Sequence, residues 1–333
     1  MDNVKKLLFA YQYIRERKFL KCSTQCFSCI DDISVASGLL KSIVISIYAI
    51  WESFIKDRIS DFYRNNRNYL YNQTFLRNYI DIAISTSYTK MMLLESIKVD
   101  DSNQLYIDIK KEILCASNNM KLSEFFNILN KVDIDVNALK NNINDNHASC
   151  YLNLRNLIEK LINLGLPIQK NKTVDSLEEF FNILVDARNS ISHTFVCNET
   201  FTSDQLECFI EIIKCMEEIT NRTLIFKQKK LEISDNPQYL TPIIFKEVIK
   251  SNTGDGNCSA ILHVVTNKNI LKKDDYIFIK KGDNLFVCRI LRIKDEEMTD
   301  VDETRPNCDY TLELDTDLTI RKRAETYNIY SVS

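Results

Sequence analysis

The stretch SLEEFFNILVDARNSISHTF (residues 176–195) carries the period that organises the first two thirds of this 333-residue sequence. Its apolar side chains recur at spacings of three and four, which places them on one face of an α-helix: Leu177, Phe180, Phe181 and Leu184. Ser176 and Glu179 have the spacing of a capping box, which predicts that the helix begins at Ser176. A second capping signal predicts another helix from Thr202 or Ser203 to about residue 229. Two such helices joined by a short loop are expected to pack antiparallel.

The same helical period recurs upstream. Residues 32–64 are predicted to form a long helix, because apolar residues hold spacings of three and four from Leu40 to Phe62. The segment 131–150 is predicted to be a loop with one short turn. Shorter helices are predicted for 4–20, 75–97, 104–116, 121–131 and 150–164. Glycine and proline, the residues least favourable inside helices, are nearly absent from the first 230 positions, which also favours an all-α region.

The period changes to that of β-strands after about residue 235. Short β-rich runs separated by turn-like stretches predict strands at 259–266, 275–281, 285–293, 310–316 and 327–332. Such closely spaced strands favour a small antiparallel β-barrel or sandwich. The spacing of LKKDDYIFIKKGDN (271–284) resembles the β-barrel that forms the second domain of translation-factor GTPases. We therefore predict an α+β multidomain protein, with an all-α helical bundle over 1–232 and a β domain over 235–333.

The overall charge is nearly balanced, with 43 Lys and Arg against 46 Asp and Glu, a net charge of −3. This is no broad basic footprint for long nucleic acid, so a nucleic-acid partner must be gripped locally or by surfaces joined in an oligomer. The 11 cysteines are an odd number, and the N-terminus lacks the pattern of a signal peptide. We expect a cytoplasmic protein with reduced thiols. The longest apolar stretch, IVISIYAIW (43–51), is too short to span a bilayer, so no membrane partner is expected.

Two groups of residues have an incomplete resemblance to metal or phosphate sites. Cys22, Cys26 and Cys29 lack a fourth ligand for zinc, so they are interpreted as small helical residues. The sequence NTGDGN (252–257) has no following Lys-Ser/Thr pair, so it is interpreted as a hairpin turn and not as a phosphate loop.

Three further features are also interpreted without a ligand. The acidic run DEEMTDVDE (295–303) lacks the ordered spacing of a calcium loop, which favours a solvated loop over a cation site. His147 and His263 have no recognisable partners and are interpreted as structural or surface residues. We therefore expect neither a metal nor a cofactor.

Arg188 and His193 are the residues whose positions need an explanation. Arg188 falls on or beside the apolar face of its helix, where an unpaired buried guanidinium is costly. Either a carboxylate neutralises it, or this face opens onto a polar cleft or a partner subunit. His193 lies five residues on, about 140° around a continuing helix. Both side chains reach one cleft only if the helix frays or if a second chain supplies the other half. The alternative without function is a capped helix end with a snorkelling arginine and a surface histidine.

The context of these two residues resembles a known family. VDARNSISHTF (185–195) is similar to the R-x4–6-H signature of the HEPN superfamily, in which the motif ends one helix and a long amphipathic helix follows a loop. IYAIWESFIKDRI (47–59) resembles the WEGFIK-type helix of the prokaryotic HEPN group that includes the MAE_28990 and RiboL-PSP types. The resemblance covers roughly residues 30–230.

The resemblance implies a helical bundle that dimerises around the motif, so that one Arg and one His from each chain form a composite cleft. Many members are metal-independent endoribonucleases of toxin–antitoxin, abortive-infection or other antiviral defence systems. By position, Arg188 and His193 are then the catalytic pair and Asn189 is a polar residue that orients the site. Glu52 is an additional acidic member. RNA is the implied substrate, and transfer RNA is the first to test.

Metal-independent RNA cleavage requires the chemistry that these residue types offer. A base must accept the proton of a 2′-hydroxyl, an acid must protonate the leaving 5′-oxygen, and a cation must face the developing negative charge on phosphorus. Histidine serves in either proton role because its usual pKa lies near neutrality. Arginine stays protonated and binds two phosphate oxygens at once. The expected products carry 2′,3′-cyclic phosphate and 5′-hydroxyl ends.

One departure from the family pattern concerns control. In HEPN toxins paired with a nucleotidyltransferase, the motif extends to R-x4-H-x-Y, and the tyrosine is modified. Phe195 stands at that place here, so control is expected from an antitoxin or regulatory partner, or from the β domain. Two alternative functions remain open: a non-catalytic HEPN module that binds RNA or protein, and a subunit of a larger defence complex.

Overall fold

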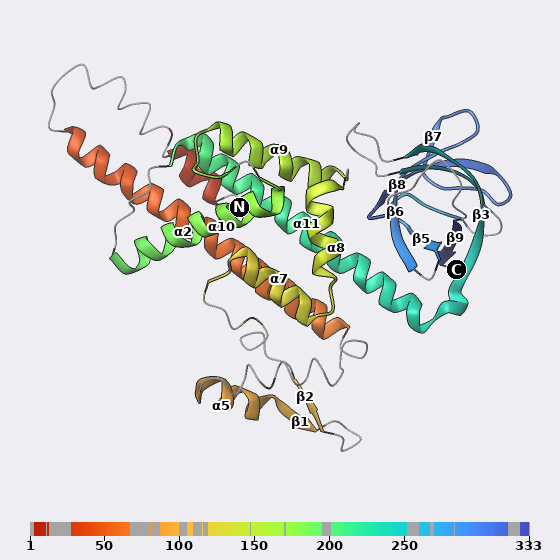
Figure 1. Ribbon diagram of the computed structural model, residues 1–333, viewed down its shortest axis with the longest axis horizontal. Coiled ribbons are helices and arrows are strands. Elements are labelled where there is room, and N and C mark those ends of the chain that lie inside the picture. The colour runs from red at the N-terminus through yellow and green to blue at the C-terminus, as the bar shows by residue number, and fades with distance from the viewer. Residues whose placement is uncertain are drawn as a thin grey trace. The chain divides into compact units, whose positions relative to one another are not determined.

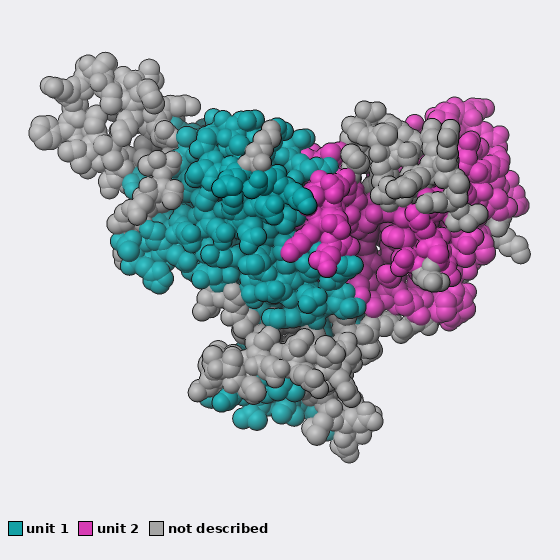
Figure 2. Space-filling model, in the orientation of Figure 1, with its two compact units in different colours: residues 1–136, 154–218 teal, residues 137–153, 219–333 magenta. Residues whose placement is uncertain are grey.

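The computed structural model of the chain is shown in Figure 1. The residues it describes are 3–10, 12, 28–66, 80, 87–99, 105–108, 115, 119–146, 148–169, 171–194, 201–251, 260–266, 270–282, 284–318 and 327–332. The chain divides into two compact units, which Figure 2 colours separately. The helical unit comprises residues 1–136 and 154–218, and the barrel unit comprises residues 137–153 and 219–333.

The helical unit consists mainly of amphipathic helices, as the sequence predicts. Its helices are α2 (Ser28–Asn65), α5 (Ser87–Ser96), α7 (Leu122–Lys131), most of α9 (Ser149–Asn163), α10 (Thr173–Thr194) and the first half of α11 (Ser203–Asp235). A short antiparallel pair, β1 (Ile97–Val99) and β2 (Leu105–Ile107), follows α5. The confirmed architecture is a helical N-terminal region followed by an antiparallel β-barrel.

The core of the helical unit is built around Trp51 of α2, whose side chain is fully buried. Its ring centroid lies 5.4 Å from that of Phe125 on α7 and 4.9 Å from that of Phe181 on α10. Offset and tilted aromatic pairs of this kind stabilise a core beyond the burial of their area. The three helices therefore contact one another through large aromatic side chains, and this packing fixes the position of α10 against α2.

Part of α2, Ser37–Asn65, is long and apolar enough to cross a membrane when length and composition alone are judged. Core helices of other proteins meet the same criterion. In this structure the apolar stripe of α2 is buried in the helical unit through Ile43, Val44, Ile47, Trp51, Ile55 and Ile59. The length of α2 is therefore accounted for by packing.

Six strands of the barrel unit close into an antiparallel β-barrel. They are β3 (Leu240–Ser251), β4 (Ala260–Val265), β5 (Tyr276–Lys281), β6 (Asn284–Lys294), β8 (Asp309–Thr316) and β9 (Asn328–Val332). The order is β5-β9-β3-β4-β8-β6, and pairing of β5 with β6 closes the circle. The two-residue strand β7 (Asp300–Val301) pairs with the end of β6. Closure removes the exposed edges that an open sheet would present.

Alternation along β5 separates the inside of the barrel from its outside. Ile277 and Ile279 belong to the core cluster inside the barrel. Phe278 packs instead with Phe226 and Ile233 of α11, which therefore covers the outer face of this strand. Successive side chains of a strand point to opposite faces, so this arrangement follows from the period of two. The second half of α11 is thus an integral part of the barrel unit.

Two predicted helix starts meet different outcomes. The capping box predicted at Thr202 forms. The backbone N–H of Gln205 donates to the Thr202 hydroxyl at 3.2 Å, and the side-chain oxygen of Gln205 accepts from the backbone N–H of Thr202 at 2.8 Å. The predicted start at Ser176 is wrong, since α10 begins at Thr173. Ser176 and Glu179 bond instead to the backbone of Gln169, at 2.9 and 2.6 Å, and so hold the preceding loop against the helix.

Three local predictions are also wrong. The segment predicted as a loop contains the helix α8 (Val136–Asp145), which buries Leu139 and Ile143 one turn apart. A helix was predicted over 104–116, but Leu105–Ile107 is a strand because it pairs with β1. The long strand β3 was not predicted, although the other five barrel strands lie where the sequence places them.

Candidate functional site

Arg188 lies at the border of the buried face of α10, as the helical period predicts. Its neighbours on that face, Leu184, Ala187 and Ile191, are buried, whereas Arg188 itself is half-buried. The guanidinium carbon lies 4.9 Å from the centroid of the ring of Tyr48, a residue of α2. Its Nη1 donates to the Asn189 side-chain oxygen at 2.9 Å. Arg188 is therefore supported by a ring face and by one amide oxygen.

No carboxylate among the described residues forms an ion pair with Arg188. Within the part of the chain that the structure describes, the guanidinium is therefore accommodated without an acidic partner. Apart from the bond to Asn189, the N–H donors of Arg188 make no hydrogen bond to a described residue. Most of these donors are thus available to an anionic ligand.

Tyr48 is buried and is held at its hydroxyl. The hydroxyl accepts from the Met120 N–H at 2.7 Å and hydrogen-bonds the Glu52 carboxylate one turn further along α2. Burial raises the pKa of Tyr48, so the hydroxyl stays protonated at neutral pH. Glu52 also accepts from Lys56 Nζ at 2.7 Å. The structure therefore brings Arg188, Asn189 and Glu52 together, with Tyr48 between Arg188 and Glu52.

The backbone of Met120 is the anchor for this part of α2. Its carbonyl accepts from Trp51 Nε1 at 3.0 Å while its N–H donates to Tyr48. Sequence reasoning treated Tyr48 as a core residue and missed its contact with the arginine. The available signal was a tyrosine one turn before Glu52 on a predicted apolar stripe, since a buried tyrosine needs a partner for its hydroxyl.

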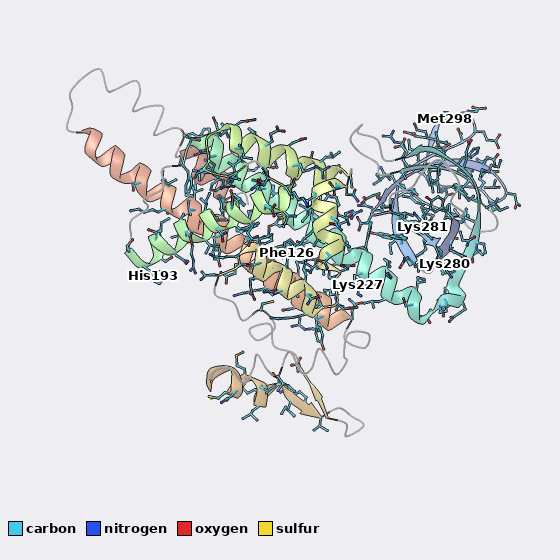
Figure 3. All side chains as sticks on the ribbon, viewed as in Figure 1. Phe126, His193, Lys227, Lys280, Lys281 and Met298 are labelled. Carbon is cyan, nitrogen blue, oxygen red and sulfur yellow. The ribbon has the colours of Figure 1, made fainter. Side chains whose placement is uncertain are left out.

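His193 lies apart from this cluster. The helix α10 continues without interruption to Thr194, so His193 stands about 140° around from Arg188. Its side chain is exposed near the end of α10, as Figure 3 shows. It makes no hydrogen bond, ion pair or ring contact with another described residue. One chain therefore does not bring the imidazole and the guanidinium to one point through a frayed helix.

Several residues discussed from the sequence lie outside the described residues. These are Cys22, Cys26, His147, Phe195 and the turn at 252–257. Cys29 falls within α2, but its side chain is also outside the described set. His263 lies on β4, with its ring nitrogens 3.8 Å from a Glu247 oxygen and 3.9 Å from an Asp309 oxygen.

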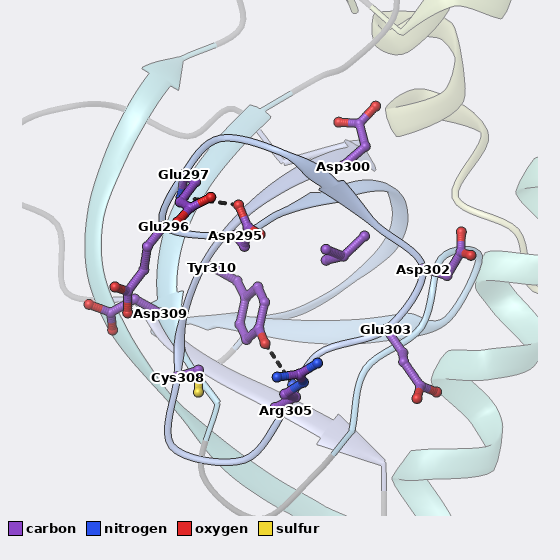
Figure 4. Close-up of a pocket in the computed structure, with 11 residues that line it drawn as sticks. Asp295, Glu296, Glu297, Asp300, Asp302, Glu303, Arg305, Cys308, Asp309 and Tyr310 are labelled. Atoms are coloured by element: carbon purple, nitrogen blue, oxygen red, sulfur yellow. Dashed lines mark hydrogen bonds between the residues drawn. The ribbon is translucent and has the colours of Figure 1, made fainter.

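The acidic run 295–303 lines an open hollow of about 830 Å³ beside the barrel, shown in Figure 4. Asp295 accepts from two backbone N–H groups of its own loop, at 3.0 and 2.9 Å. The Tyr310 hydroxyl accepts from the Arg305 N–H at 2.8 Å. The described residues contain no group of three or more His, Cys, Asp or Glu side chains that could hold a metal ion.

A second arginine, Arg222, was not singled out from the sequence and has a very different environment. It is 8% exposed, and its Nε and Nη2 both donate to the Asp315 carboxylate. Its Nη1 donates to Asp317 at 2.5 Å and to the Tyr151 hydroxyl at 3.2 Å, and Phe226 lies under the guanidinium at 4.3 Å. Burial alone would lower the pKa of Arg222, but the two carboxylates raise it well above its usual value. This buried cluster joins α9 and α11 to β8 within the barrel unit.

Comparison with known proteins identifies the helical region. The sequence model of the RiboL-PSP-HEPN family matches residues 13–224, which is more than half of the chain. The chain therefore belongs to the RiboL-PSP-HEPN family, as the motif around Arg188 and the helix around Trp51 indicated. The matched segment contains both Arg188 and His193, and it ends shortly after Arg222.

The other two comparisons add little. No curated protein matches this chain. Among solved structures, GDP-bound aIF5B from Aeropyrum pernix is similar to it at 16% identity, over 54% of this chain and 32% of that protein's chain, with a TM-score of 0.21. A TM-score this low does not show a shared fold, so the expected likeness of the barrel to a translation-factor domain stays a prediction.

Proposed function

We propose that this protein is a metal-independent endoribonuclease, with Arg188 and His193 as the catalytic pair of a centre built from two copies of the chain. HEPN domains are often ribonucleases, and family membership is the coarse basis of the proposal. The observation that carries it further is the state of Arg188. The guanidinium is half-buried, it has no carboxylate partner among the described residues, and it is held by a ring face.

The need for two copies follows from the continuity of α10. Five residues of helix separate Arg188 from His193 by about 140° of rotation and about 7.5 Å of rise. Two side chains so arranged diverge from the same helix. A two-fold axis near the end of α10 would instead bring the arginine of each chain toward the histidine of its partner. It would also concentrate positive charge on a protein whose net charge is −3.

The chemistry in such a centre divides between the two residue types. In each arginine–histidine pair the imidazole removes the proton of the 2′-hydroxyl, and the imidazolium so formed gives a proton to the leaving 5′-oxygen. The guanidinium faces the pentacoordinate phosphorus and stabilises its extra negative charge. Asn189 keeps the guanidinium in orientation through its side-chain oxygen. Cleavage by this route leaves a 2′,3′-cyclic phosphate and a 5′-hydroxyl.

The substrate and the setting are further parts of the proposal. RNA is the substrate class, and transfer RNA is the first candidate because family members often act on it. The cellular role is that of a toxin or an anti-phage defence effector acting in the cytoplasm as a homodimer. A protein partner or the barrel unit would then control the nuclease.

The test is cleavage of total cellular RNA by the purified protein in the presence of EDTA. Wild type should cleave, and Arg188→Ala and His193→Ala should not. Matched controls are Arg64→Ala, which removes an exposed arginine paired with Asp61 at 3.3 Å, and His263→Ala, which removes the barrel histidine. Both should cleave like wild type, and the new 5′ ends should accept phosphate from a polynucleotide kinase without prior treatment.

Absence of cleavage by every variant, wild type included, would contradict the proposal and favour a non-catalytic HEPN module. Cleavage that Arg188→Ala leaves unchanged would show a nuclease with a different centre. A strictly monomeric wild type that still cleaves would rule out the composite site.

A further inference from the structure

We propose that Tyr48 is a positioning residue that presents the Arg188 guanidinium to the scissile phosphate, and that Glu52 acts only through Tyr48. This inference rests on the proposed function. It assigns a role to a residue of α2 that lies outside the Arg-x4-His motif, and it changes the role expected for Glu52. The starting observation is the 4.9 Å separation between the guanidinium carbon and the centroid of the buried Tyr48 ring.

A catalytic guanidinium needs a support that leaves its N–H donors to the substrate. A carboxylate would hold the group by accepting its in-plane N–H donors, and those donors would then be lost to the substrate. A ring attracts the cation through its face and leaves the donors unused. In this structure Asn189 accepts one hydrogen bond from Arg188, and the guanidinium carbon lies 4.9 Å from the centroid of the Tyr48 ring. The support that Tyr48 gives is therefore compatible with binding of two phosphate oxygens.

The Tyr48 ring is itself held in place by its neighbours. Tyr48 is 1% exposed, and its hydroxyl is fixed by the Met120 N–H and the Glu52 carboxylate. Glu52 is in turn fixed by Lys56. Because the Tyr48 ring is restrained at its hydroxyl and buried along its length, its orientation is fixed. The Arg188 guanidinium that contacts the ring is therefore held in a fixed position as well. Two residues, Tyr48 and Arg188, thus lie between Glu52 and the phosphate, which separates Glu52 from the proton transfers.

Two substitutions of Tyr48 distinguish the role of its ring from that of its hydroxyl. Tyr48→Phe keeps the ring face but leaves the buried Met120 N–H without its partner, so it should lower thermal stability. Tyr48→Leu removes the ring face as well. If the ring positions Arg188, only the second variant should lose activity beyond what its stability explains.

The experiment is steady-state cleavage of total transfer RNA, well below the melting temperature of each variant. Tyr48→Phe should keep kcat within about twofold of wild type, while Tyr48→Leu should lower kcat by about 5-fold to 30-fold with KM unchanged. The inference would be overturned if kcat fell as much in Tyr48→Phe as in Tyr48→Leu. A wild-type kcat in Tyr48→Leu would overturn it too. Should Tyr48→Leu fail to fold, Tyr48→Met is used with the same expectation.

A second measurement keeps this inference separate from the proposed function. If wild type does not cleave RNA, the nuclease proposal fails, but the contact between Tyr48 and Arg188 is still testable by thermal unfolding. Each single variant, Tyr48→Leu and Arg188→Met, removes the same contact. The fall in Tm of the double variant should therefore be smaller than the sum of the falls in the two single variants. Simple additivity would overturn the inference.

Discussion

The two arginines with the best-defined surroundings, Arg188 in the helical unit and Arg222 in the barrel unit, solve the same physical problem in opposite ways. Arg222 is buried, and Nε, Nη1 and Nη2 all donate to carboxylates. Arg188 is half-buried over a ring, and its only hydrogen bond within the described residues goes to a neutral amide. The three guanidinium nitrogens of Arg222 all bond to protein carboxylates, which gives Arg222 a structural role. Most N–H donors of Arg188 make no bond to a described residue, so Arg188 can bind a ligand.

The difference has an energetic side. Two half-buried carboxylates offset the cost of burying the charge of Arg222, and removal of Arg222 would leave both carboxylates without their partner. Removal of Arg188 leaves no buried acid behind among the described residues. Substitution of Arg222 should therefore lower mainly the stability of the protein, whereas substitution of Arg188 should lower mainly its activity.

The largest expected effect is on activity and comes from His193. His193→Ala should lower the cleavage rate by about 10²-fold to 10⁴-fold, the range for loss of a general acid or base. Its melting temperature should stay at the wild-type value, because the side chain is exposed and makes no contact with another described residue. Rates on total RNA and thermal melts of the same preparation check both parts. A large fall in Tm would assign His193 a structural role instead.

Arg222→Met should have the largest effect on stability. It should lower the free energy of unfolding by about 3 kcal/mol, because the half-buried carboxylates of Asp315 and Asp317 would lose their buried cation. The matched variant Arg188→Met should stay within about 1 kcal/mol of wild type, apart from its loss of activity. Urea unfolding measures both.

A triple variant provides the control for Arg222. Arg222→Met combined with Asp315→Asn and Asp317→Asn removes the whole charged cluster, so it should recover a large part of the lost stability. Equal destabilisation by Arg188→Met and Arg222→Met would contradict the distinction between the two arginines.

Asn189→Asp should convert the surroundings of Arg188 toward those of Arg222. A carboxylate in place of the amide oxygen that lies 2.9 Å from Nη1 would pair with the guanidinium and weaken its attraction for phosphate. We expect cleavage to fall by roughly tenfold or more, and to fall further than in Asn189→Ala. Rates for the two variants, measured side by side, decide the matter. If Asn189→Asp cleaved RNA faster than Asn189→Ala, this result would contradict the role given to the unused N–H donors of Arg188.

The smallest effect is expected from Glu52→Gln. The glutamine amide can still bond to the Tyr48 hydroxyl, so the ring should keep its place and cleavage should stay within about threefold of wild type. Single-turnover rates across pH 5 to 9 are the appropriate measurement, since a proton-transfer role would alter the profile. A loss of about a hundredfold would restore Glu52 to the catalytic residues.

Much of the helical unit was predictable because its apolar period is long. The stripe of α2 and the face of α10 both follow spacings of three and four, and both are buried where that pattern predicts. The helix α8 was missed because VNALKNNIND is rich in asparagine, a residue that favours turns, while only Leu139 and Ile143 mark its buried face. The burial of these two residues depends on long-range packing, which a local pattern does not reveal.

The barrel and the site were predictable to different depths. Five of its strands follow from local composition, but the closing pair of β5 with β6 and the pairing of β5 with β9 are set by long-range register. For the site, the motif gave Arg188, Asn189 and His193, and the order of helices gave the family. Tyr48 was not predictable as a partner of Arg188, because contact between α2 and α10 joins residues 140 positions apart in the sequence.

The most direct test of the account is complementation between two inactive chains. Arg188→Ala and His193→Ala chains, carrying different affinity tags, are produced together, and the mixed dimer is isolated through both tags. This dimer keeps one arginine on one chain and one histidine on the other. Because α10 directs the two side chains apart within a chain, the account predicts that the mixed dimer regains cleavage, clearly above either parent, with 5′-hydroxyl ends. A mixed dimer that forms but remains as inactive as its parents would contradict the account.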